Sequence, residues 1–217
     1  QRSNADVEWF WDAALKDLGV EWMRPYDRIL DASGGIAWAK WFIGGKINIV
    51  ANCIDRRRGA QPALTWIADD GETKTWSYED LHKATSQVAA FLKQLGLKKG
   101  DTVGIYMPMV PEIVAVFFGC LKIGVVAVPV FSAFAAPALA TRLRDAEAKV
   151  LFTADGVMRR GKRTPLKPEA DAAVAQCPSV KHVVIFDRLG IDVPFTNGRD
   201  LWWRDAIARQ LADSATV

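Results

Sequence analysis

Residues 156–164, GVMRRGKRT, differ at one position from the loop by which many proteins cradle nucleotide phosphates. That loop reads Gly, four residues, Gly-Lys and then Ser or Thr, and it opens a helix. The glycines and the lysine match it, but Arg163 stands where the magnesium-binding hydroxyl would be. Pro165 and Pro168 also make it difficult for a helix to begin directly after Lys162. The sequence therefore disfavours a phosphate loop of this kind.

The same stretch is still a candidate for binding an anion. It follows the apolar run KVLFT, and open α/β sheets bind ligands where their strands end. Each charged hydrogen bond contributes about 1.5–3 kcal/mol when partly desolvated, but much less on an open surface. From the residues alone, a phosphate site and a solvated basic loop both stay open. Four cations are involved: Arg159, Arg160, Lys162 and Arg163.

The other polar residues lack partners at a spacing that would support chemistry. His82 falls on the polar side of an expected helix and His182 at the start of an expected strand, away from metal ligands or a Ser/Asp pair. Asp55-Arg56 is more typical of a structural ion pair than of a catalytic one. We therefore expect no catalytic residue and no metal site in this chain.

The three cysteines, Cys53, Cys120 and Cys177, indicate a reducing compartment. They are odd in number, far apart and without CxxC spacing, so we expect neither a disulfide framework nor a zinc site. Their apolar neighbours predict that they pack rather than react. Because the first residues also do not read as a secretory signal, a cytoplasmic protein is expected.

The bulk composition is that of a globular protein of 217 residues, half of them hydrophobic and 24% charged. A net charge of +3 does not favour a nucleic-acid partner, although basic residues cluster at 56–58 and 159–163. The apolar segment 113–131 approaches the length of a membrane span. A lysine, a glycine and a proline inside it favour a buried helix that runs into a buried strand. We expect no membrane and no nucleic-acid partner.

The chain begins with helices and a hairpin. A helix is expected over residues 6–18, followed by a Trp-rich region, 36–58, without clear periodicity. ALTWIA and KTWSY flank the turn signal Asp69-Asp70-Gly71, which predicts a hairpin. Ser77, with an aspartate three residues later, predicts a capped amphipathic helix over residues 78–95.

The remainder alternates between apolar runs and helical patterns. Nearly continuous apolar runs are typical of a parallel sheet that is covered on both faces. Four strands and three helices therefore predict an α/β fold with a mostly parallel βαβ sheet covered by helices. The strands are TVGIYM, VVAVPV, KVLFT and HVVIF, and the helices are PEIVAVFFGCLKI, APALATRLRDAEA and one near residues 168–176.

Six stretches, in the right order and spacing, resemble the AMP-forming acyl-CoA synthetases of the adenylate-forming superfamily. The resemblance is greatest to the acetyl- and propionyl-CoA synthetase branch, and it covers nearly the whole chain. It implies that the chain is the N-terminal fragment of such an enzyme. The stretches are WFIGGKINIVANCIDRR, KKGDTVGIYMPMVPE, VFSAFAAPALATRLRDAEAKVLFTADG, RRGKRTPLK, CPSVKHVVIF and GRDLWW.

In that family, ATP and a carboxylic acid form an acyl-adenylate and pyrophosphate, and CoA then attacks to give acyl-CoA and AMP. The resemblance implies ATP, Mg²⁺ and CoA for the full-length enzyme, acting on a short-chain carboxylate. The family's Ser/Thr/Gly-rich ATP loop, its ribose-binding aspartate and its adenylation lysine have no counterpart here. We therefore expect the chain alone to be inactive, to bind no cofactor tightly, and to need the rest of its own chain as a partner.

The resemblance also implies a CoA-binding surface. Relatives hold the phosphates of the 3′-phospho-ADP end of CoA on the loop that matches Arg159, Gly161 and Lys162, and Arg160 and Arg163 are two further candidate contacts.

A second family segment, FxGF, lines the CoA nucleotide. It falls on Phe131, Ser132, Ala133 and Phe134, where Ala133 replaces a glycine and its methyl group changes how closely the backbone can approach a ligand.

Three segments are expected: residues 1–5 as an artificial extension, 6–58 as an N-terminal lead-in, and 59–217 as an incomplete first α/β subdomain. Two other functions stay open. One is a stand-alone CoA- or nucleotide-binding module without catalysis, and the other is a nucleic-acid-binding domain that uses the two basic clusters.

Overall fold

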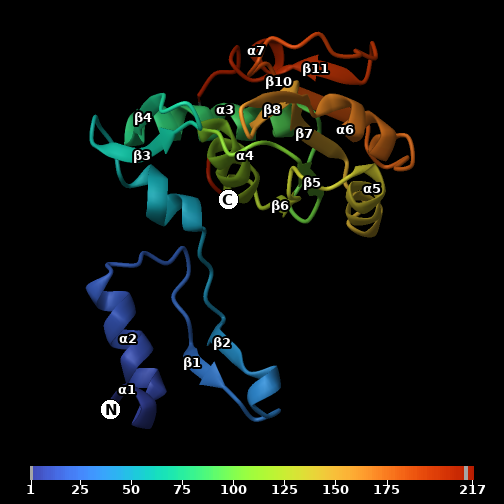
Figure 1. Ribbon diagram of the computed structural model, residues 1–217. Helices are drawn as coiled ribbons and strands as arrows, with labels where there is room; N and C mark the ends of the chain where they lie inside the picture. Colours follow the sequence, from blue (N-terminus) through green and yellow to red (C-terminus); the bar gives the residue numbers. More distant parts are fainter. Residues whose placement is uncertain (1, 213–214) are drawn as a thin grey trace.

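The computed structural model describes residues 2–212 and 215–217, and it has the expected α/β architecture (Figure 1). A five-stranded parallel sheet, in the order β11-β10-β7-β5-β6, forms its centre. All neighbouring strands in it run parallel. Four of these strands were predicted, and the fifth, β11, is only three residues long. The strands are β5 (Thr102–Ile105), β6 (Val126–Pro129), β7 (Val150–Ala154), β10 (His182–Phe186) and β11 (Asp200–Trp202).

Helices cover both faces of this sheet, because alternate strand residues point to opposite sides. On one face, Phe152 and Val184 belong to the core that includes residues of α3 (Tyr78–Gln94) and α4 (Pro111–Lys122). On the other, Leu151 and Val183 belong to the core that includes residues of α5 (Ala136–Asp145) and α6 (Lys167–Val174). A short helix, α7 (Trp203–Ala206), follows β11.

The expected start of α3 at Tyr78 is confirmed. The Ser77 hydroxyl accepts a hydrogen bond from the Asp80 backbone N–H at 3.1 Å, and the Asp80 carboxylate accepts one from the Ser77 N–H at 2.9 Å. Together they form the predicted cap of α3. The apolar segment 113–131 comprises most of α4 followed by β6. In the described part of the chain, every helix is too short or too polar to serve as a membrane span.

In the described residues, three antiparallel hairpins accompany the central sheet. The predicted hairpin around Gly71 is present, and the other two were not predicted. One of these lies in the lead-in, where the sequence showed no periodicity. They are β1 (Arg28–Asp31) with β2 (Lys40–Ile43), β3 (Pro62–Ile67) with β4 (Thr73–Ser77), and β8 (Gly156–Arg159) with β9 (Lys162–Pro165).

The N-terminal part stands apart from the main body in Figure 1. It comprises α1 (Arg2–Ala5), α2 (Val7–Asp17) and the β1–β2 hairpin. The Asn52 side chain joins the two parts, because its amide accepts from the Glu21 N–H at 2.8 Å and donates to the Glu21 carbonyl at 2.9 Å. Asn52 belongs to a π-helical turn, Ala51–Asp55, that leads into the main body.

Candidate functional site

The basic stretch forms the β8–β9 hairpin rather than a loop that opens a helix. Arg159 and Lys162 are opposite each other in its register. The two residues between them, Arg160 and Gly161, have φ angles of 49° and 74°. Positive φ at both central residues is the conformation of a type I′ turn, which suits the twist of a two-residue hairpin. The structure thus agrees with the sequence argument against a P-loop, because the next helix begins only at Lys167.

The base of the hairpin is fixed by close packing at Gly156. A side-chain Cβ at this position would lie 2.6 Å from Ile191 Cδ1 and 2.8 Å from the Thr164 carbonyl oxygen. Such distances are too short for any other residue without movement of the backbone. Close packing therefore explains why Gly156 is a glycine, without any contact to a phosphate.

A buried carboxylate joins the hairpin to the loop that follows β10. Asp155 is fully buried, and it accepts backbone N–H groups from Gly156 at 2.7 Å, Arg188 at 3.1 Å, Leu189 at 2.9 Å and Ile191 at 3.0 Å. These four hydrogen bonds compensate for the loss of water around the buried carboxylate. Asp155 consequently sets the relative position of β8 and the 188–191 loop.

Two adjoining cavities lie beside the hairpin. The first, of about 290 Å³, contains Arg159 and Ser132 in its lining and is called here the Arg159 cavity. The second, of about 280 Å³, has Asp69, Asp70, Glu72, Glu112 and Asp187 in its lining and is called the acidic cavity. Both volumes are near the lower end for small-molecule sites. The residues common to the two linings are Trp66, Ala68, Asp69, Met158 and Arg188.

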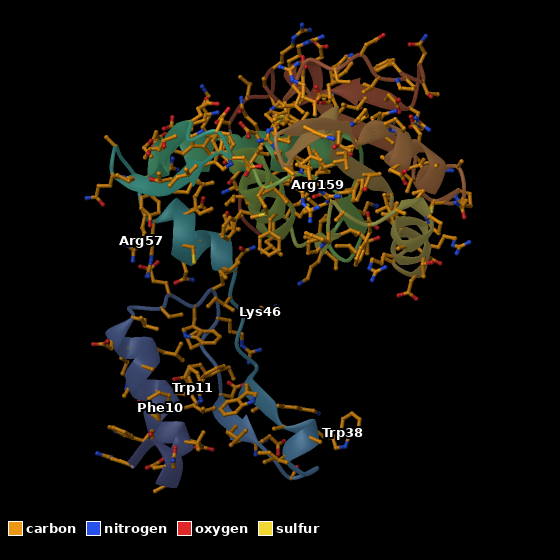
Figure 2. All side chains as sticks on the ribbon, viewed as in Figure 1. Phe10, Trp11, Trp38, Lys46, Arg57 and Arg159 are labelled. Atoms are coloured by element: carbon orange, nitrogen blue, oxygen red, sulfur yellow. The ribbon has the colours of Figure 1, made fainter. Side chains whose placement is uncertain are left out.

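The structure brings some of the predicted site residues together. Ser132 and Arg159 line the same cavity, although they are distant in sequence. Arg159 is exposed on the main body, where Figure 2 shows it away from Arg57. The remaining predicted residues lie outside the lining of the Arg159 cavity: Phe131, Ala133, Arg160, Gly161, Lys162 and Arg163.

The FxGF-like segment is a turn before α5 that aromatic contacts hold together. The rings of Phe131 and Phe134 meet edge to face at 5.9 Å, and the Arg142 guanidinium lies 4.5 Å from the Phe134 ring centre. Phe131 is 66% exposed, so its ring offers an open apolar surface next to the cavity residue Ser132. An exposed ring of this kind can stack on a nucleobase.

Tyr106 and Glu169 position this turn, and no sequence motif indicated either residue. The Tyr106 hydroxyl donates to the Phe134 carbonyl at 2.7 Å, and Glu169 accepts the Ala136 N–H at the start of α5 at 2.7 Å. Burial, assisted by the charge of Glu169 and opposed by Arg159, raises the pKa of Tyr106 to about 12. Tyr106 is therefore a neutral donor at physiological pH.

A second polar cluster is centred on Asp55. The Lys122 ammonium lies 2.7 Å and His82 Nε2 lies 3.3 Å from Asp55 Oδ1, and the Thr216 hydroxyl donates to Oδ2. Burial raises the pKa of Asp55, but the hydrogen bonds from Lys122 and Thr216 outweigh it and hold that pKa below its usual value. The Asp55 carboxylate thus neutralises the charge of Lys122, the buried lysine of α4.

The Asp55 cluster corrects two expectations from the sequence. Asp55 pairs with Lys122 rather than with Arg56, whose side chain donates instead to backbone carbonyls, including that of Asn52 at 2.8 Å. His82 is buried rather than on the polar side of α3, and its Nδ1 lies 2.8 Å from Arg58 Nη1.

The cysteines are free, and two of the three are buried as expected. Burial raises the pKa of the Cys120 thiol to about 12, which makes it unreactive. Cys53 is exposed, which corrects the expectation that all three pack. Within residues 2–212 and 215–217, His, Cys, Asp and Glu side chains form no group of three or more that could hold a metal ion.

Comparisons with known proteins agree with this architecture. The sequence model described as "AMP-binding enzyme" matches residues 52–214, and the one described as "Acetyl-coenzyme A synthetase N-terminus" matches residues 1–53. Among solved structures, acetoacetyl-CoA synthetase from Streptomyces lividans matches with a TM-score of 0.88 at 25% identity. This match covers 98% of the present chain and 32% of that chain.

Curated relatives match at higher identity. Acetyl-coenzyme A synthetase from Methanothrix thermoacetophila is 44% identical over 212 residues, which are 95% of this chain and 32% of that protein. Acetyl-coenzyme A synthetase from Mycolicibacterium smegmatis is 43% identical over 203 residues, which are 91% of this chain and 21% of that protein. The chain thus spans about a third of the length of these relatives, or less.

Proposed function

This chain belongs to the AMP-binding enzyme family, and we propose that it is the N-terminal portion of an AMP-forming short-chain acyl-CoA synthetase. The family match confirms the resemblance that the six sequence stretches indicated. The observation that carries the proposal is the 44% identity to an acetyl-coenzyme A synthetase over 95% of this chain. We place the enzyme in the cytoplasm, with a carboxylate, ATP and CoA as its small-molecule partners.

The proposed reaction needs groups beyond those of this chain. Formation of an acyl-adenylate requires ATP phosphates held with Mg²⁺, and the family's Ser/Thr/Gly-rich ATP loop, ribose-binding aspartate and adenylation lysine have no counterpart in this sequence. We therefore assign ATP and Mg²⁺ binding to the remainder of the full-length enzyme. The role of the present chain is to carry part of the surface that receives CoA.

The β8–β9 hairpin supports this role because several of its side chains are positively charged and two of them point to the same side. Because Arg159 and Lys162 face each other across the hairpin, their cations lie on the same side of it. Guanidinium and ammonium groups placed in this way suit the phosphates of the 3′-phospho-ADP end of CoA. Gly161 serves by forming the turn that brings them together. Arg160 and Arg163, on the same hairpin, add positive charge.

The turn before α5 supplies the second half of the proposed surface. Ser132 shares a cavity with Arg159, and the exposed Phe131 ring lies beside it in sequence. The hydroxyl can bind a phosphate or ribose oxygen, and the ring can pack on the adenine. Ala133 adds a methyl group where the family pattern has glycine, so we expect CoA to approach this backbone less closely than in relatives with glycine.

Carboxylate-dependent exchange between pyrophosphate and ATP tests the proposed function. The full-length protein that contains this chain should catalyse exchange with acetate, propionate or butyrate, and the 217-residue chain should not. The relative rates would also identify the preferred acid. No exchange with any carboxylic acid would contradict the synthetase proposal and favour a CoA- or nucleotide-binding module.

A further inference from the structure

The loop after β10 presents an arginine, Arg188, to the same cavity as Arg159. Its backbone is fixed, because the Arg188 N–H donates to the buried carboxylate of Asp155 at 3.1 Å. The same carboxylate accepts the N–H of Gly156, the first residue of β8. Asp155 therefore holds the two arginine-bearing segments in one arrangement.

The Arg188 side chain is held over an aromatic ring. Its guanidinium carbon lies 5.6 Å from the centre of the Trp66 ring, within the range of a cation–π contact. The Trp66 indole N–H donates to the Met109 carbonyl at 2.7 Å, which fixes the ring. Across the described part of the chain, no carboxylate lies within ion-pair distance of Arg188. Its charge is thus positioned but not neutralised by a salt bridge.

The charges of the two cavities differ in sign. The lining of the Arg159 cavity contains two arginines and one carboxylate, Asp69. The acidic cavity contains five carboxylates, against Arg188 and Lys74, and Lys74 already pairs with Glu112 at 3.3 Å. An anion is therefore favoured in the Arg159 cavity and disfavoured in its neighbour.

From this arrangement we infer that Arg188 is a second phosphate-binding arginine. It binds the phosphorylated nucleotide end of CoA together with Arg159, and Asp155 acts as the positioning residue that sets the spacing of the two guanidinium groups. Two planar guanidinium donors match the oxygens of a phosphate better than one. This inference rests on the proposed CoA surface and extends it to a loop that the family-based motifs did not include.

The test is equilibrium binding of adenosine 3′,5′-bisphosphate to the full-length protein, with excess AMP present to occupy the ATP site. Arg188→Gln and Arg159→Gln should each weaken binding about tenfold, as expected for a charged hydrogen bond. Arg188→Lys should weaken it less, because the positive charge remains. The matched control is Arg57→Gln, which removes an exposed arginine away from this surface and should leave affinity unchanged (Figure 2).

The outcomes separate this inference from the proposal on which it rests. If Arg159→Gln weakens binding and Arg188→Gln behaves like Arg57→Gln, the role of Arg188 is refuted and the CoA surface stands. If neither Arg159→Gln nor Arg188→Gln changes the affinity, the CoA surface and the role of Arg188 are both refuted. Circular dichroism spectra and melting temperatures equal to those of the wild type would show that each variant is folded.

Discussion

His82 shows how a single buried side chain is fixed by its neighbours. Arg58 can only donate, so the contact of 2.8 Å makes His82 Nδ1 the acceptor and leaves the ring hydrogen on Nε2. That hydrogen faces Asp55 Oδ1 at 3.3 Å. The neutral ring therefore accepts a hydrogen bond from Arg58 and donates one to Asp55. A second proton, on Nδ1, would point at the positively charged Arg58 guanidinium.

This geometry predicts a pH-dependent contribution of His82 to stability. Burial, with the charges of Arg58 and Lys122, lowers the pKa of His82 below its ordinary value of 6.5, against the opposite effect of Asp55 and Glu79. The unfolded chain then binds more protons than the folded chain as pH falls below about 6.5, so stability decreases in that direction. The contribution is fully present above pH 6.5 and is lost as pH falls through the lowered pKa.

His82→Gln should remove this dependence, because an amide can accept from Arg58 and donate to Asp55 without titrating. Melting temperatures of the full-length protein at pH 7.5 and 5.5 measure the effect. The difference between the two temperatures should be smaller in the variant than in the wild type. An unchanged difference would show that His82 does not contribute.

At the scale of an element, the β8–β9 hairpin depends on its two-residue turn. Gly161 has a φ of 74°, in a region where residues with a side chain are strained. A β-branched residue is the most restricted there, whereas asparagine is tolerated. The hairpin bears Arg159 and Lys162, so the turn also sets the direction of the proposed phosphate contacts.

Gly161→Val should destabilise the hairpin by about 1–2 kcal/mol. This corresponds to hydrogen exchange about 5- to 30-fold faster at the β8 and β9 amides if the hairpin opens locally. Gly161→Asn, the matched control, should show a much smaller increase. Equal exchange rates in the valine variant, the asparagine variant and the wild type would contradict the assignment of a type I′ turn.

The sequence predicted the central elements because their signals are local. The apolar runs predicted four strands of the sheet, and Ser77 with Asp80 predicted the cap of α3. The β8–β9 hairpin was missed because the stretch MRRGKR has neither an alternating apolar pattern nor an Asn-Gly or Asp-Gly turn.

The polar contacts were harder to predict than the strands. His82 was expected on the polar side of α3 because Thr85 and Ser86 lie on the same face of the helix. Both residues are polar but buried, so a hydrophobicity pattern does not identify this face as buried. The pairing of Asp55 with Lys122 joins residues 67 positions apart, and no local signal indicates it. Of the predicted site residues, Ser132 and Arg159 line one cavity, and Arg188 enters that cavity from a loop that carries no motif.

At the scale of the whole molecule, the described chain consists of an N-terminal part and a main body. The N-terminal part is held by aromatic contacts, such as Trp22 with Tyr26 at 5.1 Å and Trp22 with Phe42 at 5.4 Å. It joins the main body through Asn52, and Figure 2 shows the labelled Trp11 and Trp38 on it, far from Arg159. The proposed CoA surface therefore belongs to the main body alone.

The central claim is that this surface receives CoA and takes no part in forming the adenylate. The most direct measurement compares the two half-reactions of the full-length enzyme for the wild type and Arg159→Ala. We predict that kcat/KM for CoA falls about tenfold or more, with a reduced preference for CoA over dephospho-CoA. Carboxylate-dependent ATP–pyrophosphate exchange should remain near the wild-type rate. An equal loss of both half-reactions would contradict the claim and make Arg159 a structural residue.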